Sequence, residues 1–485
     1  SFPPLLPFRS RARVRTPEHE VSMALSTPPQ PPNGEPLLTG SVDPSDTTTT
    51  CSGDARKAVE DSKAVENSYV WLMVLAVFGV FMAVVTPMAI SLAIRVDQLA
   101  PGHEEYLGYI TGAGGITAIL TAPVFGMVSD RTRSRLGRRR PLLIAGTVVG
   151  LVALLVMALA DGVLVLALGW MLAQVGWGTV LALLTASQAD RLPEAQRGKV
   201  AALTGVVQQL APVSGALLAG ALSGSSLLMF LVPGAVGAVS MFFFVRFVHE
   251  PDSRDLPLPE GRLTLRTLTA SYVFDPRRSP DFAWNCLGKF LFMFGLTLTS
   301  TFTAFFLAAR TGVSVKEVSG TVAVLGGAGI GATMLGAIGG GFLSDRLRRR
   351  RVFVLIGACV FATGAITMAL APTVPVIIAG AVLGNLGLGL FATVDQAVML
   401  DVLPERETSA GRYAGIYGFS TTLAQGVAPL AAPLVLLIGG EAGGGAGGGG
   451  GTGGGDKNYT LLYFMAAALT FLGGLVIATR IKSVR

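Results

Sequence analysis

The chain has 485 residues, of which 51% are hydrophobic and 14% are charged, and its mean hydropathy is +0.60. A charged fraction this far below the roughly 25% of an average soluble domain excludes an ordinary water-soluble globular protein. The net charge is +7, so nucleic acid must be tested as a partner from where the basic residues lie. The cysteines, Cys51, Cys286 and Cys359, are far apart and predict neither a disulfide framework nor a metal site.

Residues 1–68 are rich in Pro, Ser, Thr and charge, which predicts a disordered cytoplasmic tail. Four arginines between Arg9 and Arg15 form a basic arm, for which a solvated tail is favoured over contact with anionic lipid. Met23 is an alternative start that would remove this arm. The first long apolar run begins near Val70, too deep in the chain for a cleavable signal peptide.

Twelve later runs are long and apolar enough to cross a bilayer as helices, which takes about 20 residues each. They predict an all-α polytopic membrane protein with a bundle at 69–247, a cytoplasmic linker at 248–282 and a second bundle at 283–485. Between 439 and 455, 13 of 17 residues are Gly, which predicts a flexible extracellular loop. The predicted spans are 70–94, 106–128, 141–160, 163–186, 200–222, 226–247, 283–309, 318–343, 352–371, 374–398, 413–438 and 459–480.

The basic residues are distributed unequally between the two sets of loops. The loops on the side of the chain ends carry 24 Lys and Arg outside the tail, whereas the opposite loops carry 4. The positive-inside rule therefore predicts that both termini lie in the cytoplasm of a multi-pass cell-membrane protein. The same distribution accounts for the positive charge without a nucleic-acid-binding surface.

Two motifs occur twice at nearly one spacing. The second span ends in Gly-Met-Val-Ser-Asp-Arg, finishing at Arg131, and the eighth ends in Gly-Phe-Leu-Ser-Asp-Arg, finishing at Arg346, an offset of 215. Gln174 in the fourth span and Asn385 in the tenth are each followed sixteen residues later by Asp-x-Leu-Pro-Glu, an offset of 211. The repeats predict two pseudo-symmetric six-helix bundles, the arrangement in which many transporters rock one repeat against the other.

The first copy continues as Gly126-x-x-x-Asp130-Arg131-x-Arg-x-Arg-Leu-Gly137-Arg138-Arg-Arg-Pro. It resembles the G-x-x-x-D-R-x-G-R-R signature that the major facilitator superfamily carries between its second and third helices. Its longer loop is similar to that of the sucrose-transporter-like branch and the related glycoside–pentoside–hexuronide cation symporters. The resemblance covers about residues 70–485 and implies the major facilitator fold, secondary transport and a monomer.

The repeated motif also predicts a cytoplasmic gate. A carboxylate at a helix end can pair with a guanidinium or with the positive end of a helix from the other half. Contacts made in one conformation and broken in the other would bias alternating access. Asp190 with Arg197, and Asp401 with Arg406 or Arg412, would form a second layer. The predicted gate residues are Gly126, Asp130, Arg131, Gly137, Arg138, Arg139, Asp190, Arg197, Gly341, Asp345, Arg346 and Asp401.

The middle of the spans is nearly free of charge and contains amides and indoles instead. Amides that bond hydroxyls and rings that cover apolar faces suit a neutral polyhydroxyl solute, although such residues also bond helices together. Asp395, about one turn inside the tenth span, is the best coupling candidate. The second span lacks the acids usual in cation-coupled relatives, and Leu172 stands where many proton-coupled facilitators have an arginine. The predicted cavity residues are Gln174, Trp177, Gln208, Asn285, Asn385 and Gln425.

The chain has no nucleotide-binding motif, zinc-ligand spacing or hydrolase triad, so neither enzyme activity, a cofactor nor a metal is predicted. The favoured function is a secondary transporter for a small neutral polar solute such as a saccharide, with protons as a candidate coupling ion. Efflux of a drug or metabolite is an alternative. A membrane sensor or scaffold that moves no solute is a third reading.

Overall fold

The computed structural model describes residues 67–192, 194–248, 250, 252–254, 275–404, 410–437 and 458–481. Most of the predicted tail and the whole Gly-rich loop at 439–455 lie outside these residues. The segment Lys63–Arg485 forms one compact unit. Within the described ranges, twelve helical segments are long and apolar enough to cross a membrane and no strand occurs, which confirms the predicted fold class.

The N-terminal half holds six of the spans. Its first span is broken at Pro87, which lacks a backbone N–H and therefore cannot continue the α-helical ladder. A short π-helical turn follows at that point before the α-helix resumes. The elements are α2 (Asn67–Thr86), η1 (Pro87–Ser91) and α3 (Leu92–Leu99), then α4 (Glu105–Arg131), α5 (Arg140–Ala158), α6 (Val163–Arg191), α7 (Glu194–Ala221) and α8 (Ser226–Phe247).

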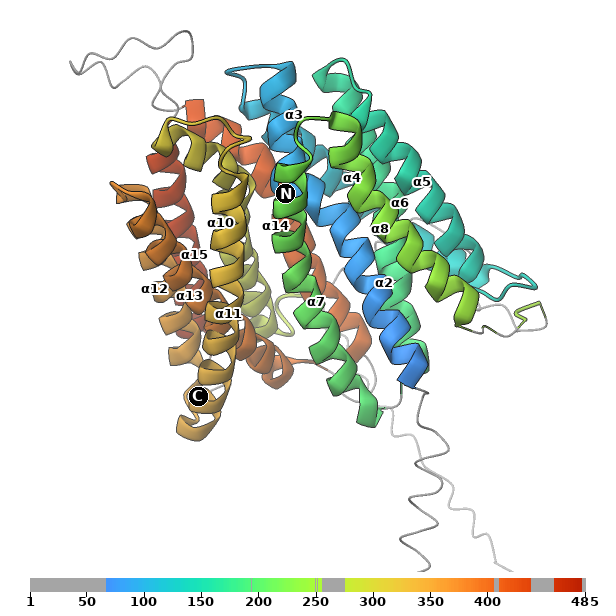
Figure 1. Cartoon of the computed structure of the whole chain (residues 1–485). Helices are drawn as coiled ribbons and strands as arrows, with labels where there is room; N and C mark the ends of the chain where they lie inside the picture. The colour runs from blue at the N-terminus through green and yellow to red at the C-terminus, as the bar shows by residue number, and fades with distance from the viewer. Residues whose placement is uncertain are drawn as a thin grey trace, which may run out of the picture. The chain divides into compact units, whose positions relative to one another are not determined.

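The C-terminal half holds the other six spans and begins three residues before the predicted start of the second bundle at 283. In Figure 1 the helices run alongside one another, those of the first half coloured blue to green and those of the second yellow to red. We call the end at which α2 begins and α15 ends the terminal end, and the opposite end the distal end. The elements are α10 (Pro280–Thr311), α11 (Ser319–Leu347), α12 (Arg350–Leu370), α13 (Val374–Val402), α14 (Ala410–Leu437) and α15 (Tyr459–Arg480).

Glycines allow the same close helix contact in both halves. A Cβ on Gly176 of α6 would lie 2.4 Å from the backbone nitrogen of Gly150 on α5. A Cβ on Gly387 of α13 would lie 2.4 Å from the backbone nitrogen of Phe361 on α12. Gly176 and Gly387, like Gly150 and Phe361, are 211 residues apart. Small residues at these positions let the backbones pack, which is how helices associate when lipid removes the hydrophobic driving force.

The two halves meet mainly through two helix pairs, α4 with α14 and α7 with α11, and α10 also touches η1 and α4. A Cβ on Gly115 of α4 would lie 2.5 Å from the Cα of Gly426 on α14, and one on Gly220 of α7 would lie 2.2 Å from the hydroxyl of Ser319 on α11. Gly115 lies in the distal half of α4, and both Gly220 and Ser319 lie at the distal ends of their helices. The halves are therefore in tight contact on the distal side.

Candidate functional site

At the terminal end of the first half, two arginines share one aspartate. Arg138 donates to Asp190 at 3.0 Å, and Arg139 donates to the same carboxylate from Nε at 3.1 Å and also from Nη2. Asp130 lies 3.8 Å from Arg138. The predicted gate aspartates thus join one network through the arginines of the repeated motif. Arg197 was predicted to pair with Asp190, but its side chain is not among those described.

The second half builds the matching network with one arginine. Arg350 contacts Asp345 at 2.9 Å and Asp401 at 2.5 Å. Arg350 is 211 residues after Arg139, as Asp401 is after Asp190. Arg406 and Arg412, the partners predicted for Asp401, lie outside the described side chains; among the described residues Arg350 pairs with Asp401. Sequence inspection missed it because the partner comes from the start of the next helix.

Each of these ion pairs lies inside one half. Of the two partners predicted for Asp130, a guanidinium or a helix end of the other half, it faces the guanidinium of Arg138 in this conformation. Gly126 is one of the predicted gate residues, and a Cβ there would meet no atom within 4 Å. A Cβ on its repeat partner Gly341 would lie 3.2 Å from Thr393, also within one half. In this conformation the ion pairs of the four gate aspartates join elements of their own half.

The loop between α4 and α5 is joined to the residues that follow α8. Glu250 accepts hydrogen bonds from the backbone nitrogens of Arg139 and Arg140 at 3.1 Å, which caps the start of α5. Gly137 has φ +93°, a left-handed backbone that favours glycine, and a Cβ there would collide with the Glu250 side chain. Ser253 adds a bond from the backbone of Ser134 at 3.0 Å. Gly137 is therefore a structural requirement of this loop.

A buried ionic cluster lies in the second half. Lys289 of α10 donates to Asp395 of α13 at 3.2 Å and to the hydroxyl of Tyr417 of α14 at 2.7 Å. Tyr417 donates to the same carboxylate oxygen, Oδ2, of Asp395. The Asp395 side chain is 0% exposed, and the Lys289 ammonium lies 3.9 Å from the centre of the Tyr417 ring. Three helices thus converge on one carboxylate, which we call the Lys289 cluster.

Several polar atoms in the Lys289 cluster have no hydrogen-bond partner among the described residues. The Oδ1 atom of Asp395 and both amide atoms of Asn285 are buried without a hydrogen bond among the described residues. Asn285 lies one turn before Lys289 on α10 and close to the Asp395 carboxyl. The thiol of Cys286 also lies near Asp395 and Lys289. Because a buried charge is costly without full compensation, such a site is sensitive to gain or loss of a proton.

The sequence indicated Asp395 but missed Lys289 and Tyr417 as its partners. A signal was present: Lys289 lies nine residues from the start of α10, Asp395 seven from the end of α13 and Tyr417 seven from the start of α14. All three positions lie about 10–14 Å from the same end of the bundle at 1.5 Å per residue. Opposite charges at equal depth in neighbouring spans are expected to pair.

The predicted cavity residues lie in different environments. Trp177 is 0% exposed and packs against Gly150 and Gly237 inside the first half, so it is a core residue rather than one open to a solute. Asn385 accepts a hydrogen bond from the hydroxyl of Thr333 on α11 at 3.3 Å and donates one to a carbonyl on its own helix. It therefore bonds two helices together, which was the alternative to solute contact. Asn285 belongs to the Lys289 cluster. Gln174 and Gln208 are half-buried and Gln425 is exposed.

The chain belongs to the major facilitator superfamily, whose family model matches residues 71–340. It is therefore a multi-pass membrane transporter of small solutes and not an enzyme, as the repeated motif and the twelve helices indicated. A curated relative, the general alpha-glucoside permease of Schizosaccharomyces pombe, is 36% identical over 78 residues, which are 16% of this chain and 13% of the permease. The chain thus matches about an eighth of that relative's length.

Solved transporters share the fold at low sequence identity. The nucleoside transporter NupG aligns with a TM-score of 0.66 at 14% identity, covering 85% of this chain and 99% of that one. A D-xylose-proton symporter aligns with a TM-score of 0.63 at 15% identity, covering 86% and 98%. A bacterial homologue of the human lysosomal transporter Spinster, in an inward-facing and unoccupied conformation, has a TM-score of 0.62 at 16% identity, covering 84% and 97%.

Proposed function

We propose that this transporter moves a neutral polar solute of the saccharide class by alternating access, coupled to protons through the Lys289 cluster. It would lie in the cell membrane with its terminal end in the cytoplasm, as the 24 to 4 distribution of basic residues favours. The relative named an alpha-glucoside permease and the structural neighbour named a xylose-proton symporter support this substrate class. Half-buried or exposed amides at Gln174, Gln208 and Gln425 are the proposed solute contacts.

The arrangement of contacts supports an inward-facing state. The halves touch through glycines at the distal side, whereas the ionic networks of Asp130 and Asp345 stay inside their own halves at the terminal side. In the outward-facing state the terminal ends would close on one another. The predicted gate residues would then exchange partners within one half for partners in the other, which is how they would bias the transport cycle.

The observation that carries the coupling proposal is the burial of Asp395 between two donors. Asp395 is the one carboxylate among the described residues that is fully buried, and Lys289 balances its charge. A proton that reaches Asp395 from the distal side in the outward-facing state would remove the charge that holds Lys289. The ammonium would then need water or another acceptor, so α10 would separate from α13 and α14. Release of the proton on the terminal side would restore the pair. Proton binding and helix movement would be linked in this way.

The test is uptake of labelled maltose, sucrose and xylose into proteoliposomes, with and without an inward proton gradient. Saturable uptake of at least one sugar that the gradient accelerates is expected for the wild type. Asp395→Asn should lose the acceleration while still exchanging sugar across the membrane at equal pH. Asp97→Asn changes an acid in α3 outside the cluster and serves as the matched control, which should keep the acceleration.

Two outcomes would reject parts of the proposal separately. Sugar uptake that ignores the gradient in the wild type would contradict proton coupling and leave the substrate class standing. Extrusion of amphipathic dyes from a dye panel, with no sugar uptake, would contradict the substrate class and favour the efflux alternative.

A further inference from the structure

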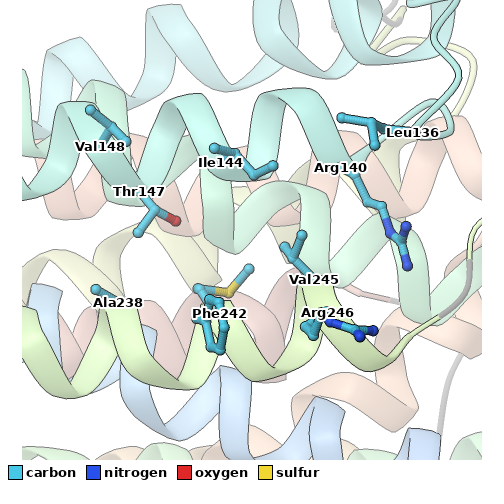
Figure 2. A pocket seen from close by; sticks show the side chains of 10 residues that line it. Leu136, Arg140, Ile144, Thr147, Val148, Ala238, Phe242, Val245 and Arg246 are labelled. Carbon is cyan, nitrogen blue, oxygen red and sulfur yellow. The ribbon is translucent and has the colours of Figure 1, made fainter.

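A groove of about 500 Å³ lies on the outside of the first half, between α5 and α8. Figure 2 shows that Val148 and Ala238 lie at one end of this groove and that Arg140 and Arg246 lie together at the other. Its apolar lining includes Phe242, whose side chain is 64% exposed. The groove extends about 12 Å from Arg140 to Val148 at 1.5 Å per residue of α5.

The two arginines have unused donors. Arg140 donates one hydrogen bond to the carbonyl oxygen of Val248, and its Nε is buried without a partner among the described residues. The nearby carboxylate of Glu250 accepts from backbone nitrogens at the start of α5. Arg246 lies over the ring of Phe247, 5.6 Å from its centre, and makes no ion pair in the described part of the chain. The polar end of the groove therefore carries net positive charge.

We propose that this groove binds an anionic phospholipid of the surrounding bilayer. Its phosphate would accept hydrogen bonds from Arg140 and Arg246, and one acyl chain would lie along the apolar lining towards Val148 and Ala238. The groove opens on the lipid-facing side of two membrane-spanning helices, so a lipid is the occupant available to it. Guanidinium groups bind phosphate oxygens in charge-assisted pairs, which selects an anionic headgroup over a zwitterionic one.

A bound lipid would reinforce the junction between α5 and α8. Arg140 already connects the start of α5 to Val248, which follows the last residue of α8. A phosphate shared with Arg246 would add a second link between the same two helices. The lipid would therefore stabilise the terminal end of the first half, and it does so whatever solute the transporter moves.

The second half provides a natural comparison for this site. Arg351, 211 residues after Arg140, donates in the same way to the carbonyl oxygen of Ile481, which follows α15. Counting back from that residue, Thr479 stands where the first half has Arg246. The neighbouring Arg480 lies over the ring of Trp284 at 5.2 Å. The pair of arginines facing one groove is thus a feature of the first half.

The experiment is native mass spectrometry of the full-length protein, delipidated and then given equimolar phosphatidylglycerol and phosphatidylcholine. The measured quantity is the ratio of the two bound lipids. Wild type should favour phosphatidylglycerol. Each arginine near a membrane surface contributes about 1 kcal/mol, so Arg246→Gln should lower the ratio roughly five-fold and the Arg140→Gln/Arg246→Gln pair on the order of twenty-five-fold.

Two further variants separate the groove from general surface charge. Arg480→Gln removes one positive charge at the corresponding end of the second half and should keep the wild-type ratio. Ala238→Trp fills the apolar part of the groove and should reduce binding of phosphatidylglycerol while both arginines remain. Equal ratios in wild type and Arg246→Gln would overturn the proposal, as would an equal loss in Arg246→Gln and Arg480→Gln. The single variant decides the matter if the double variant does not fold.

Discussion

The two halves of this transporter share a scaffold of arginine contacts. At the distal side, Arg95 donates to the carbonyl of Ala160 at 2.7 Å and to the hydroxyl of Ser226 at 3.0 Å. Arg310, 215 residues later, donates to the carbonyl of Ala369 and to the hydroxyl of Thr460. In each half, one arginine thus connects the end of the first span to the third and sixth spans.

The halves differ in what fills this scaffold. Subtracting the repeat offsets places Val74 at the position of Lys289 and Leu184 at the position of Asp395, and both are buried apolar residues. The aromatic packing differs as well. In the first half Trp177 packs against Gly150, and the residue that corresponds to Gly150 in the second half is Phe361. If the Lys289 cluster couples protons as proposed, the arginine scaffold that both halves repeat maintains the fold, whereas the unrepeated cluster carries the coupling chemistry.

The largest expected effect comes from leaving one charge of the Lys289 cluster unpaired. Lys289→Met should lower the free energy of unfolding by about 3–5 kcal/mol, because Asp395 would remain buried without its cation. The double variant Lys289→Met/Asp395→Leu makes the second half resemble the first and should regain most of that stability. Unfolding in mixed micelles measures both, and Val74→Ala is a control for a small change at the matching site.

Transport by the double variant sharpens the same comparison. Restored stability without proton-driven uptake would separate the function of the cluster from its contribution to the fold. A double variant as unstable as Lys289→Met would show instead that the ion pair holds the second half together, and it would contradict the assignment of chemistry to the unrepeated residues.

An intermediate effect is expected where backbones touch. Gly176→Ala and Gly387→Ala place a Cβ against backbone atoms in equivalent positions, so each should cost about 1–3 kcal/mol of unfolding free energy. Gly331→Ala, where a Cβ would meet nothing within 4 Å, is the matched control and should be neutral or slightly stabilising. Chemical unfolding of the three variants in the same micelles checks this. Unequal losses at Gly176 and Gly387 would show that the halves do not share their packing.

The smallest effect concerns the terminal networks. Arg350 pairs with two aspartates by itself, whereas Arg138 and Arg139 both pair with Asp190. Arg350→Gln should therefore destabilise its half more than Arg138→Gln. Both losses should stay under about 1 kcal/mol, since the pairs are partly exposed to solvent. Thermal unfolding at low and high salt measures the difference, which salt should reduce. An equal loss in the two variants would mean that Arg139 does not compensate.

Contacts between the two halves depend on how the helices are rotated and shifted against one another, which the linear sequence does not show. Gly126 and Gly115 lie on the same helix and look alike in the sequence, yet only Gly115 has a backbone neighbour in this conformation. Trp177 and Gln174 are three residues apart, and one is core while the other is half-buried. When a helix is apolar all round, its sequence periodicity does not show which face packs against protein and which faces lipid, because the lipid and the protein interior are equally apolar.

The sequence by itself determined the number of spans, the repeat and the family, because hydrophobic length and duplicated motifs are properties of the linear chain. It also indicated Asp395, since an acid inside a span is costly and therefore informative. Only the tertiary structure decided that Lys289 and Tyr417 bind one oxygen of that acid and that Arg350 links two aspartates. These pairings join residues from different helices, and their distances depend on how the helices pack in three dimensions.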